Sequence, residues 1–315
     1  GAAPGVWTLD QVAYWQKQGL WPIAGNSAPI GLFMGGATGA TYYNVIDYIS
    51  ISSTGNATDF GDLTIARFAL GSCASTTRAC AAGGEMSGSR TARIDYVTIA
   101  TVGNATIFGN LTSGNNYATA GCNSTTRGVF GGGIPDGYAG STMDYITIAS
   151  TGNATNFGTL ATVTYSNAGC SSSTRGLFAG GDSNGVSTNA IQYITIASTG
   201  NATSFGQLTA ARYGVEGSSN STRALFAGGA GTNVIDYVTI ASTGNATDFG
   251  DLTFTTGLGS GSAPSSTTRA VFGGGGTNAL CYVSIATTGN ASSFGQVTVS
   301  RNDMTGCSSN NGGVQ

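Results

Sequence analysis

The chain has 315 residues and a formal net charge of −3, and only 8% of its residues are charged. Its 11 lysines and arginines are dispersed, so they do not form the basic patch that nucleic-acid binding requires. The absence of histidine removes the commonest general base and the commonest metal ligand of proteins. Composition therefore argues against nucleic-acid binding, catalytic triads and histidine-ligated copper chemistry, and we expect neither a cofactor nor a metal.

Residues 1–25 differ from the rest of the chain, because they contain all three tryptophans, Trp7, Trp15 and Trp21. A Thr-x-x-Gln capping box predicts a short helix over about residues 9–18. The apolar side of such a helix needs a partner. We expect either a lid on the chain's own core or an attachment to another subunit, and the three tryptophans are candidate assembly residues.

A segment of about 20 residues, seen at 233–252, recurs six times between residues 26 and 315. The steps between copies are 48, 49, 48, 44 and 45 residues. A period of this length with four strand-like runs per copy is typical of propeller blades, since each small sheet needs a neighbour to cover its apolar faces. The sequence predicts an all-β fold, a six-bladed β-propeller over residues 26–315. The copies are marked by the glycine of a Gly-Asn turn, at Gly55, Gly103, Gly152, Gly200, Gly244 and Gly289.

Each copy contains four runs in the same order. The first, such as Arg212–Asn220, carries a cysteine in most copies and is predicted to be innermost. The second run ends in Gly-Gly, and the third carries a tyrosine. A Gly-Asn turn then leads to a fourth run, which carries a phenylalanine and is predicted to be outermost. Glycine and asparagine are expected in this turn because both residues tolerate positive φ. The repeats begin with a second run, Ile30–Gly36, and end with a first run, Arg301–Ser309. We expect these two runs to pair and to close the ring.

Several recurring positions are predicted to be structural. All six cysteines are expected to be unpaired and buried. An aspartate that precedes the strand tyrosine is expected to bond backbone where blades meet, at Asp47, Asp95, Asp144 and Asp236. An arginine after each Ser/Thr run could grip an anionic partner near the axis, or bond carbonyl groups of the adjoining blade. These arginines are Arg78, Arg127, Arg175, Arg223 and Arg269.

The order of runs resembles the kelch repeat over residues 26–310, with Phe where kelch blades usually carry Trp. The opening Gly-Val-Trp-Thr-Leu-Asp-Gln, the following Trp-Pro and the recurring Tyr-Ile-Thr-Ile-Ala-Ser-Thr-Gly-Asn-Ala-Thr resemble virion structural proteins of tailed phages, particularly marine cyanophages. Members of that family are tail fibres, appendages or other outer virion components. The resemblance spans essentially the whole chain and implies a place on the virion surface, outside the cell.

The loops that follow the Gly-Gly pairs vary between copies, whereas the turns on the other face are nearly uniform. Loops on a rigid scaffold commonly carry recognition, and drift of unconstrained loops is the alternative. Glu85 and Asp136 are the two acids that a hydrolytic site would have to use. The receptor-binding candidates in these loops are Tyr42, Tyr43, Glu85, Arg90, Arg93, Asp136, Tyr138 and Asp182.

These observations favour a non-enzymatic virion surface protein, a tail fibre or appendage that recognises a host receptor, which we expect to be a cell-surface glycan. The alternative is a purely structural connector or decoration protein of the virion. Expected partners are other virion subunits, bound through residues 1–25, and a glycan or protein of the host surface, with an oligomer in the virion. No apolar stretch reaches the roughly 18 residues of a membrane-spanning helix, so no membrane insertion is expected.

Overall fold

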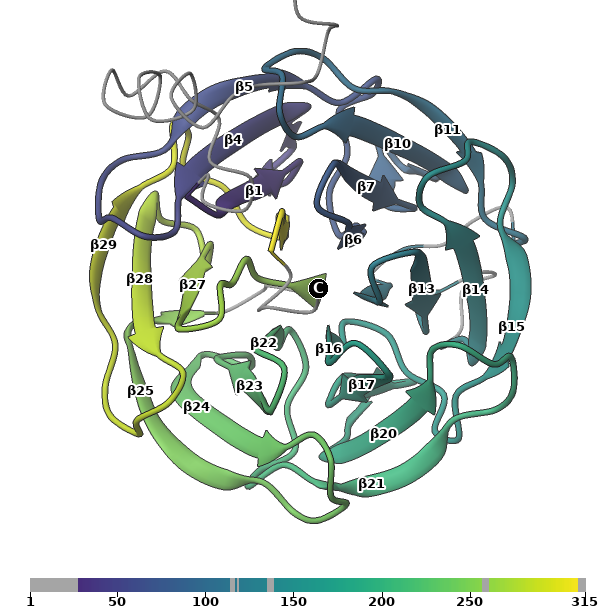
Figure 1. The fold of residues 1–315 in the computed structure, drawn as a ribbon, viewed down its shortest axis with the longest axis vertical. Coiled ribbons are helices and arrows are strands. Elements are labelled where there is room, and N and C mark those ends of the chain that lie inside the picture. Colours follow the sequence, from purple (N-terminus) through teal and green to yellow (C-terminus); the bar gives the residue numbers. More distant parts are fainter. Residues whose placement is uncertain (1–27, 114–116, 118, 135–138, 257–260, 311–315) are drawn as a thin grey trace, which may run out of the picture.

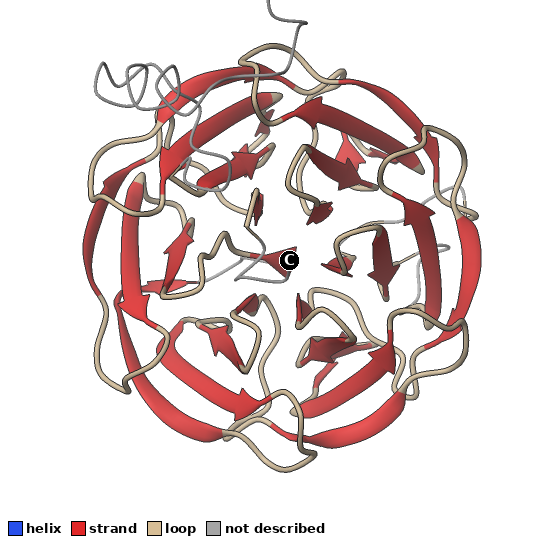
Figure 2. Cartoon of the chain, viewed as in Figure 1, coloured by secondary structure: helices blue, strands red, loops and turns tan. Residues whose placement is uncertain are grey.

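The described chain consists of β-strands and connecting turns, arranged as a ring of small sheets around a central axis (Figure 1, Figure 2). The computed structural model describes residues 28–113, 117, 119–134, 139–256 and 261–310. These residues contain no helix, and hence none long and apolar enough to cross a membrane. The prediction of an all-β fold is confirmed. The helix expected over about residues 9–18 and the three tryptophans Trp7, Trp15 and Trp21 lie outside the described residues.

Successive stretches of chain form antiparallel sheets whose strands are ordered from the axis outward (Figure 1). One sheet combines both ends of the described chain, β30 (Thr305–Ser308), β1 (Ile30–Met34), β4 (Val45–Ser50) and β5 (Thr58–Asp62). The next contains β6 (Gly71–Ala74), β7 (Arg78–Ala82), β10 (Arg93–Thr98) and β11 (Thr106–Asn110). It is followed by β12 (Ala120–Asn123), β13 (Arg127–Gly131), β14 (Thr142–Thr147) and β15 (Thr155–Thr159).

The remaining strands repeat this order, except that the last sheet has only three strands. After β15 come β16 (Ala168–Ser171), β17 (Arg175–Ala179), β20 (Ala190–Thr195) and β21 (Thr203–Gln207). They are followed by β22 (Glu216–Ser219), β23 (Arg223–Ala227), β24 (Thr232–Thr239) and β25 (Thr247–Thr256), and then by β27 (Arg269–Gly273), β28 (Ala279–Ser284) and β29 (Ser292–Gln296). Short hairpins stand where only loops were expected, β2 (Ala37–Thr38) with β3 (Thr41–Tyr42), β8 (Glu85–Met86) with β9 (Ser89–Arg90), and β18 (Asp182–Ser183) with β19 (Val186–Ser187).

The two ends of the described chain are joined by antiparallel pairing of β1 with β30, in which Leu32 lies opposite Cys307. This confirms the expected pairing of the terminal runs. The innermost strands are shorter than predicted, because Arg212 and Arg301 precede β22 and β30 instead of belonging to them. Both arginines lie in the connection from the preceding sheet, where they are buried in ion pairs with Asp236 and Asp47, and the inner strand begins after them.

The apolar core lies between successive sheets. Leu177 and Phe205 of one sheet form a single buried cluster with Phe226 of the next sheet. Within a sheet, the tyrosine of the third strand packs edge-on against the phenylalanine of the outermost strand, as Tyr96 does against Phe108 at 5.9 Å between ring centroids. All six cysteines are free and buried, as predicted. Four of them lie on innermost strands, Cys73, Cys122, Cys170 and Cys307.

The Gly-Asn turns bind each sheet to the outermost strand of the preceding one. The backbone N–H of Gly103 donates to the carbonyl of Phe60 at 2.8 Å, and the N–H of Asp62 donates to Oδ1 of Asn104 at 3.0 Å. The same contact joins the two ends of the described chain, where the Gly55 N–H donates to the carbonyl of Phe294 at 2.8 Å. Among described residues, no asparagine of these turns has positive φ. The expectation that Asn serves the turn's own φ was therefore wrong, since its side chain serves the neighbouring strand.

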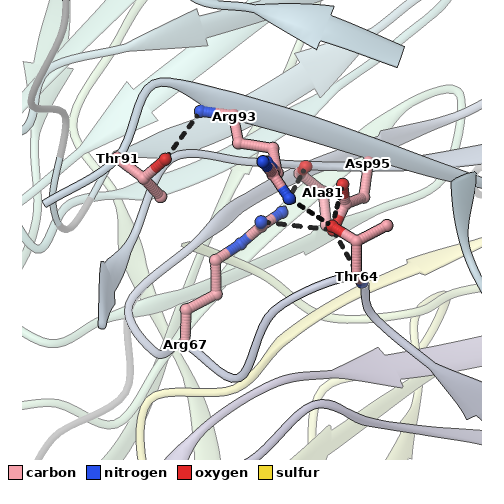
Figure 3. A network of polar contacts seen from close by, with 6 residues as sticks. All are labelled: Thr64, Arg67, Ala81, Thr91, Arg93 and Asp95. Carbon is pink, nitrogen blue, oxygen red and sulfur yellow. Dashed lines mark hydrogen bonds and ion pairs between the residues drawn. The ribbon is translucent and has the colours of Figure 1, made fainter. Parts of the chain in front are cut away.

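A buried carboxylate holds each of several junctions between sheets, and Figure 3 shows the junction around Asp95. Thr64, which follows the outermost strand of the preceding sheet, donates its N–H and its hydroxyl to Asp95 at 3.1 and 2.7 Å. Arg67 pairs with the same carboxylate at 3.2 Å and donates to the carbonyl of Ala81 at 3.1 Å. Burial lowers the pKa of Arg67 to about 10, with the charge of Asp95 acting in the opposite direction.

The same junction recurs with variations. The carboxylate of Asp47 accepts a hydrogen bond from the hydroxyl of Thr298 and forms an ion pair with Arg301 at 2.9 Å. Both contacts lie where the two ends of the described chain meet. Asp236 pairs with Arg212 at 2.9 Å, whereas Asp144 receives the N–H and hydroxyl of Thr112 and has no ion pair with a described residue. The prediction that these aspartates are structural and bond backbone at junctions is confirmed.

The recurring arginines are also used inside the ring. Nη1 of Arg78 donates to the carbonyl of Ile148 in the next sheet at 2.8 Å, and its guanidinium lies 4.3 Å from the ring centre of Tyr96. Nη1 of Arg269 likewise donates to the carbonyl of Ile51 at 3.2 Å, and this bond joins the end of the repeats to their beginning. The sequence left two alternatives open for these arginines, and the structure shows the second, hydrogen bonding to carbonyl groups of the adjoining sheet.

The axis of the ring is occupied by part of the chain itself. Strand β26 (Gly261–Ser262) pairs in parallel with β16 and β22 and also contacts β6, β12 and β30. The hydroxyl of Ser262 lies 2.8 Å from the carbonyl oxygen of Gly121 and 3.0 Å from that of Gly169. Residues of five innermost strands therefore surround this short segment and close the axis.

We predict that replacing Arg67 with Met lowers the free energy of unfolding by about 3–5 kcal/mol, because Asp95 then remains buried without its charge partner. Denaturant-induced unfolding followed by circular dichroism measures this loss. Asp144→Asn is the matched control, since it keeps an acceptor for Thr112 and breaks no ion pair with a described residue. Equal losses for the two variants would contradict a role for the ion pair.

Candidate binding site on the loop face

The face of the ring that carries the hairpins after the Gly-Gly pairs, here called the loop face, is built on the segments that enter the innermost strands. An aromatic residue lies just before the inner strand in four successive copies, at Phe68, Tyr117, Tyr165 and Tyr213. Backbone hydrogen bonds join these segments side by side, such as the one from the Gly214 N–H to the Ser166 carbonyl at 2.9 Å. The aromatic residues therefore surround the axis.

Each aromatic residue also positions the loop of its own sheet. Phe68 and Glu85 exchange two backbone hydrogen bonds of 3.1 and 3.0 Å, which fix the start of hairpin β8–β9. Tyr165 and Asp182 exchange an equivalent pair of 3.0 and 2.9 Å at the start of hairpin β18–β19. The variable loops are thus tied to the residues around the axis, and the two sets form one surface.

A pocket of about 290 Å³ opens where these segments meet, and we call it the axial pocket. Its walls come from segments that enter β12, β16, β22 and β30, together with hairpin β18–β19. The pocket combines three phenol rings with two carboxyl groups. Its lining is Tyr117, Tyr165, Ser166, Asp182, Tyr213, Gly214 and Asp303.

The acidic groups of the axial pocket are strongly affected by burial. Burial raises the pKa of Asp303 to about 7, and its carboxylate forms no hydrogen bond or ion pair with another described residue. Burial, together with the charges of Asp303 and Glu85, raises the pKa of Tyr117 to about 12. The pKa of Tyr165 is raised by burial and by its interaction with Asp182. Tyr117 and Tyr165 therefore remain neutral hydrogen-bonding groups, and Asp303 is the carboxyl group left to pair with a ligand.

A line of stacked rings, the aromatic row, leads from hairpin β2–β3 to the axial pocket. Tyr42 stacks on Phe68 with ring centroids 5.2 Å apart, and Phe68 meets Tyr117 edge-on at 5.5 Å. Arg90 lies 5.5 Å from the centre of the Tyr117 ring and donates to the carbonyl of Ile134 at 3.2 Å. Rings and a guanidinium in this arrangement suit contact with sugars or protein side chains.

A second hollow, of about 450 Å³, lies between hairpins β2–β3 and β8–β9. Tyr42 forms one wall, so this residue belongs both to the hollow and to the aromatic row. The other wall is largely apolar and includes Ile65 and Met86. The loop face therefore offers two neighbouring depressions connected by aromatic rings.

The structure brings four of the sequence-predicted candidates to this surface, Tyr42, Glu85, Arg90 and Asp182. Arg93 instead donates to Thr64 Oγ1 at 3.1 Å beside the buried junction in Figure 3. Tyr43 uses its backbone to receive the N–H of Arg67 at 3.1 Å and to donate to Gly36 at 2.9 Å. Asp136 and Tyr138 lie outside the described residues, so the suggested acid pair of Glu85 and Asp136 is not described.

Sequence reasoning missed the residues that form most of the axial pocket, Tyr117, Tyr165, Tyr213 and Asp303. The available signal was the recurrence of an aromatic residue one repeat apart, three residues before the inner strand in each of the four copies. Among the residues that the structure describes, no three Cys, Asp or Glu side chains are grouped closely enough to hold a metal ion. A comparison of the chain with protein-family models and with curated proteins finds no match.

Beneath the axial pocket, Glu216 begins inner strand β22 with 4% of its surface exposed. Its Oε1 has no hydrogen-bond partner, and the Gly273 backbone N–H is its stabilising contact. Burial raises the pKa of Glu216 to about 8. The folded state therefore binds a proton that the unfolded state releases above its ordinary pKa of 4.5, so stability is lost as the pH rises toward 8.

We predict that Glu216→Gln increases the free energy of unfolding at pH 8 by about 2–5 kcal/mol, since a neutral amide removes the cost of the buried charge. Denaturant titrations between pH 4.5 and 8 measure the effect. Near pH 4.5 the wild-type side chain is neutral in the folded state, so the gain should be small there and should grow as the pH rises. A variant that is less stable at pH 8 would contradict the assignment.

Proposed function

We propose that the chain is a six-bladed, kelch-like β-propeller that serves, without catalysis, as a surface protein of a tailed-phage virion, a tail fibre or appendage. In this proposal the loop face recognises a glycan on the host cell, and residues 1–25 attach the protein to other virion subunits. The chain is then an oligomer in the particle.

The propeller architecture is supported by contacts that repeat from sheet to sheet and recur between the two ends of the chain. Three interactions join the beginning of the repeats to their end. They are the hydrogen bond from the Gly55 N–H to the Phe294 carbonyl, the ion pair of Asp47 with Arg301, and the pairing of β1 with β30. The repeated order of runs and its resemblance to the kelch repeat point the same way. A sheet at the end of an open array would leave such groups without partners.

The observation that carries the recognition role is the concentration of rings and charges on the loop face. The axial pocket and the aromatic row combine phenol rings, carboxylates and Arg90, which can stack on a sugar ring and bond its hydroxyl groups. The arginines of the opposite turns are engaged with neighbouring sheets. The sequence contains no histidine, which favours binding over acid–base catalysis.

The second candidate is a structural connector or decoration protein of the virion. Exposed apolar side chains away from the loop face favour it, because Val102 of a Gly-Asn turn is 66% exposed and Ile107 of β11 is 52% exposed. In an assembled particle these side chains could lie against another subunit.

We predict that Tyr42→Ala/Arg90→Ala lowers the binding of the full chain to host cells at least tenfold, because Tyr42 belongs to the aromatic row and Arg90 lies over its Tyr117 ring. Binding of fluorescently labelled protein to intact cells measures this. Val102→Ala/Ile107→Ala is the matched control and should bind like wild type. Loss of binding only in the control would overturn recognition by the loop face, and no binding by wild type to any host would favour the connector.

A further inference from the structure

The axial pocket has an excess of negative charge. Among the described residues, its lining contains two carboxyl groups and no lysine or arginine. Asp182 is already engaged, since it accepts the N–H of Gly185 and interacts with the hydroxyl of Tyr165. Asp303 is partly buried, burial raises its pKa, and no described side chain is bonded to its carboxyl group. A cation that enters the pocket would restore the interactions that the Asp303 carboxylate has lost.

The walls of the pocket define what kind of cation fits. Tyr117, Tyr165 and Tyr213 provide three ring faces and three hydroxyl groups around the carboxylate. Ring faces attract ammonium groups, and ring faces with hydroxyls also pack against the apolar and polar sides of a sugar. A calcium ion would need six to eight oxygen ligands, and the described residues contain no group of three acidic or thiol side chains. The lining is therefore suited to an organic cation.

The size of the pocket limits the ligand further. Its volume of about 290 Å³ lies at the lower end of the range for small-molecule sites, which suits one sugar residue and not a longer segment. Arg90 stands on the ring of Tyr117, next to the pocket but outside its lining, where it can meet neighbouring hydroxyl or acidic groups of a glycan. Positive and negative subsites thus lie next to each other on the loop face.

We propose that the axial pocket binds an amino sugar, with its protonated amine paired to Asp303 and its ring held among Tyr117, Tyr165 and Tyr213. This inference rests on the proposed function, because it names the chemical class of the glycan that the loop face would recognise. Asp182 is a positioning residue in this site, since it holds Tyr165 and the start of hairpin β18–β19.

The test uses the full chain at pH 7 with three probes of equal ring size, glucosamine, N-acetylglucosamine and glucose. Titration by calorimetry or by ligand-observed NMR should give a dissociation constant for glucosamine at least tenfold below those of the two neutral sugars. Asp303→Asn should weaken glucosamine binding at least tenfold and leave the neutral sugars unchanged. This substitution suits the backbone, because residue 303 has a φ of 52° and asparagine tolerates that region.

A second variant guards against loss of folding. Tyr213→Phe keeps the ring and removes one hydroxyl group, so it should weaken all three sugars without abolishing the preference for the amine. Equal affinity for glucosamine and glucose, or full glucosamine affinity in Asp303→Asn with native circular dichroism, would overturn the proposal.

Cell binding separates this inference from the proposed function. If the wild-type chain binds host cells through the aromatic row but does not prefer glucosamine, the amino-sugar site is refuted and receptor recognition stands. If glucosamine binds as expected but no host cell is bound, the site is supported and the role in adsorption is refuted.

Discussion

The structure depends on polar junctions between neighbouring sheets. Around the ring the chain forms narrow sets of three or four antiparallel strands, so much of the apolar surface of each set is covered by the next set. Apolar packing alone would allow two such sheets to slide, because it is not directional. The carboxylate of Asp95, held by both donors of Thr64 and by Arg67, defines one register between them. The Gly-Asn turns define a second point at the outer edge, which fixes the angle between sheets.

Much of this fold can be predicted from the sequence, because a repeat displays its local rules several times. The alternation of β-branched and aromatic residues, the innermost cysteines, the outermost phenylalanines and the pairing of β1 with β30 all follow from one copy and its two incomplete ends. The roles of the turn asparagines and of Arg212 do not. The asparagine side chains bond a neighbouring sheet, and Arg212 pairs with Asp236 two strands further along its own copy, so a pattern read along the chain offers no reason to separate these residues from a turn or a strand.

The candidate site was predicted only in part for a related reason. Loop residues such as Arg90 and Asp182 are conspicuous because they differ between copies. Tyr165 and Tyr213 occupy a repeated position and therefore resemble scaffold, yet the closure of the ring brings them together around one pocket. Asp303 follows Tyr213 by 90 residues and Tyr165 by 138 residues, and it meets them because β30 completes the sheet of β1. A repeated scaffold position can thus become a site where successive copies converge.

The short strand β26 places part of the chain on the axis, at the level where inner strands begin. Gly261 pairs with Ala168 and with Glu216, the first residues of two inner strands whose entering segments line the axial pocket. Among the described residues, five innermost strands surround β26, so the chain itself occupies the centre of the ring. In the proposed glycan-binding role, a linear polymer would enter the axial pocket with a terminal unit, and the number of chain ends on a cell surface, more than the mass of polymer, would determine how many copies of the protein bind.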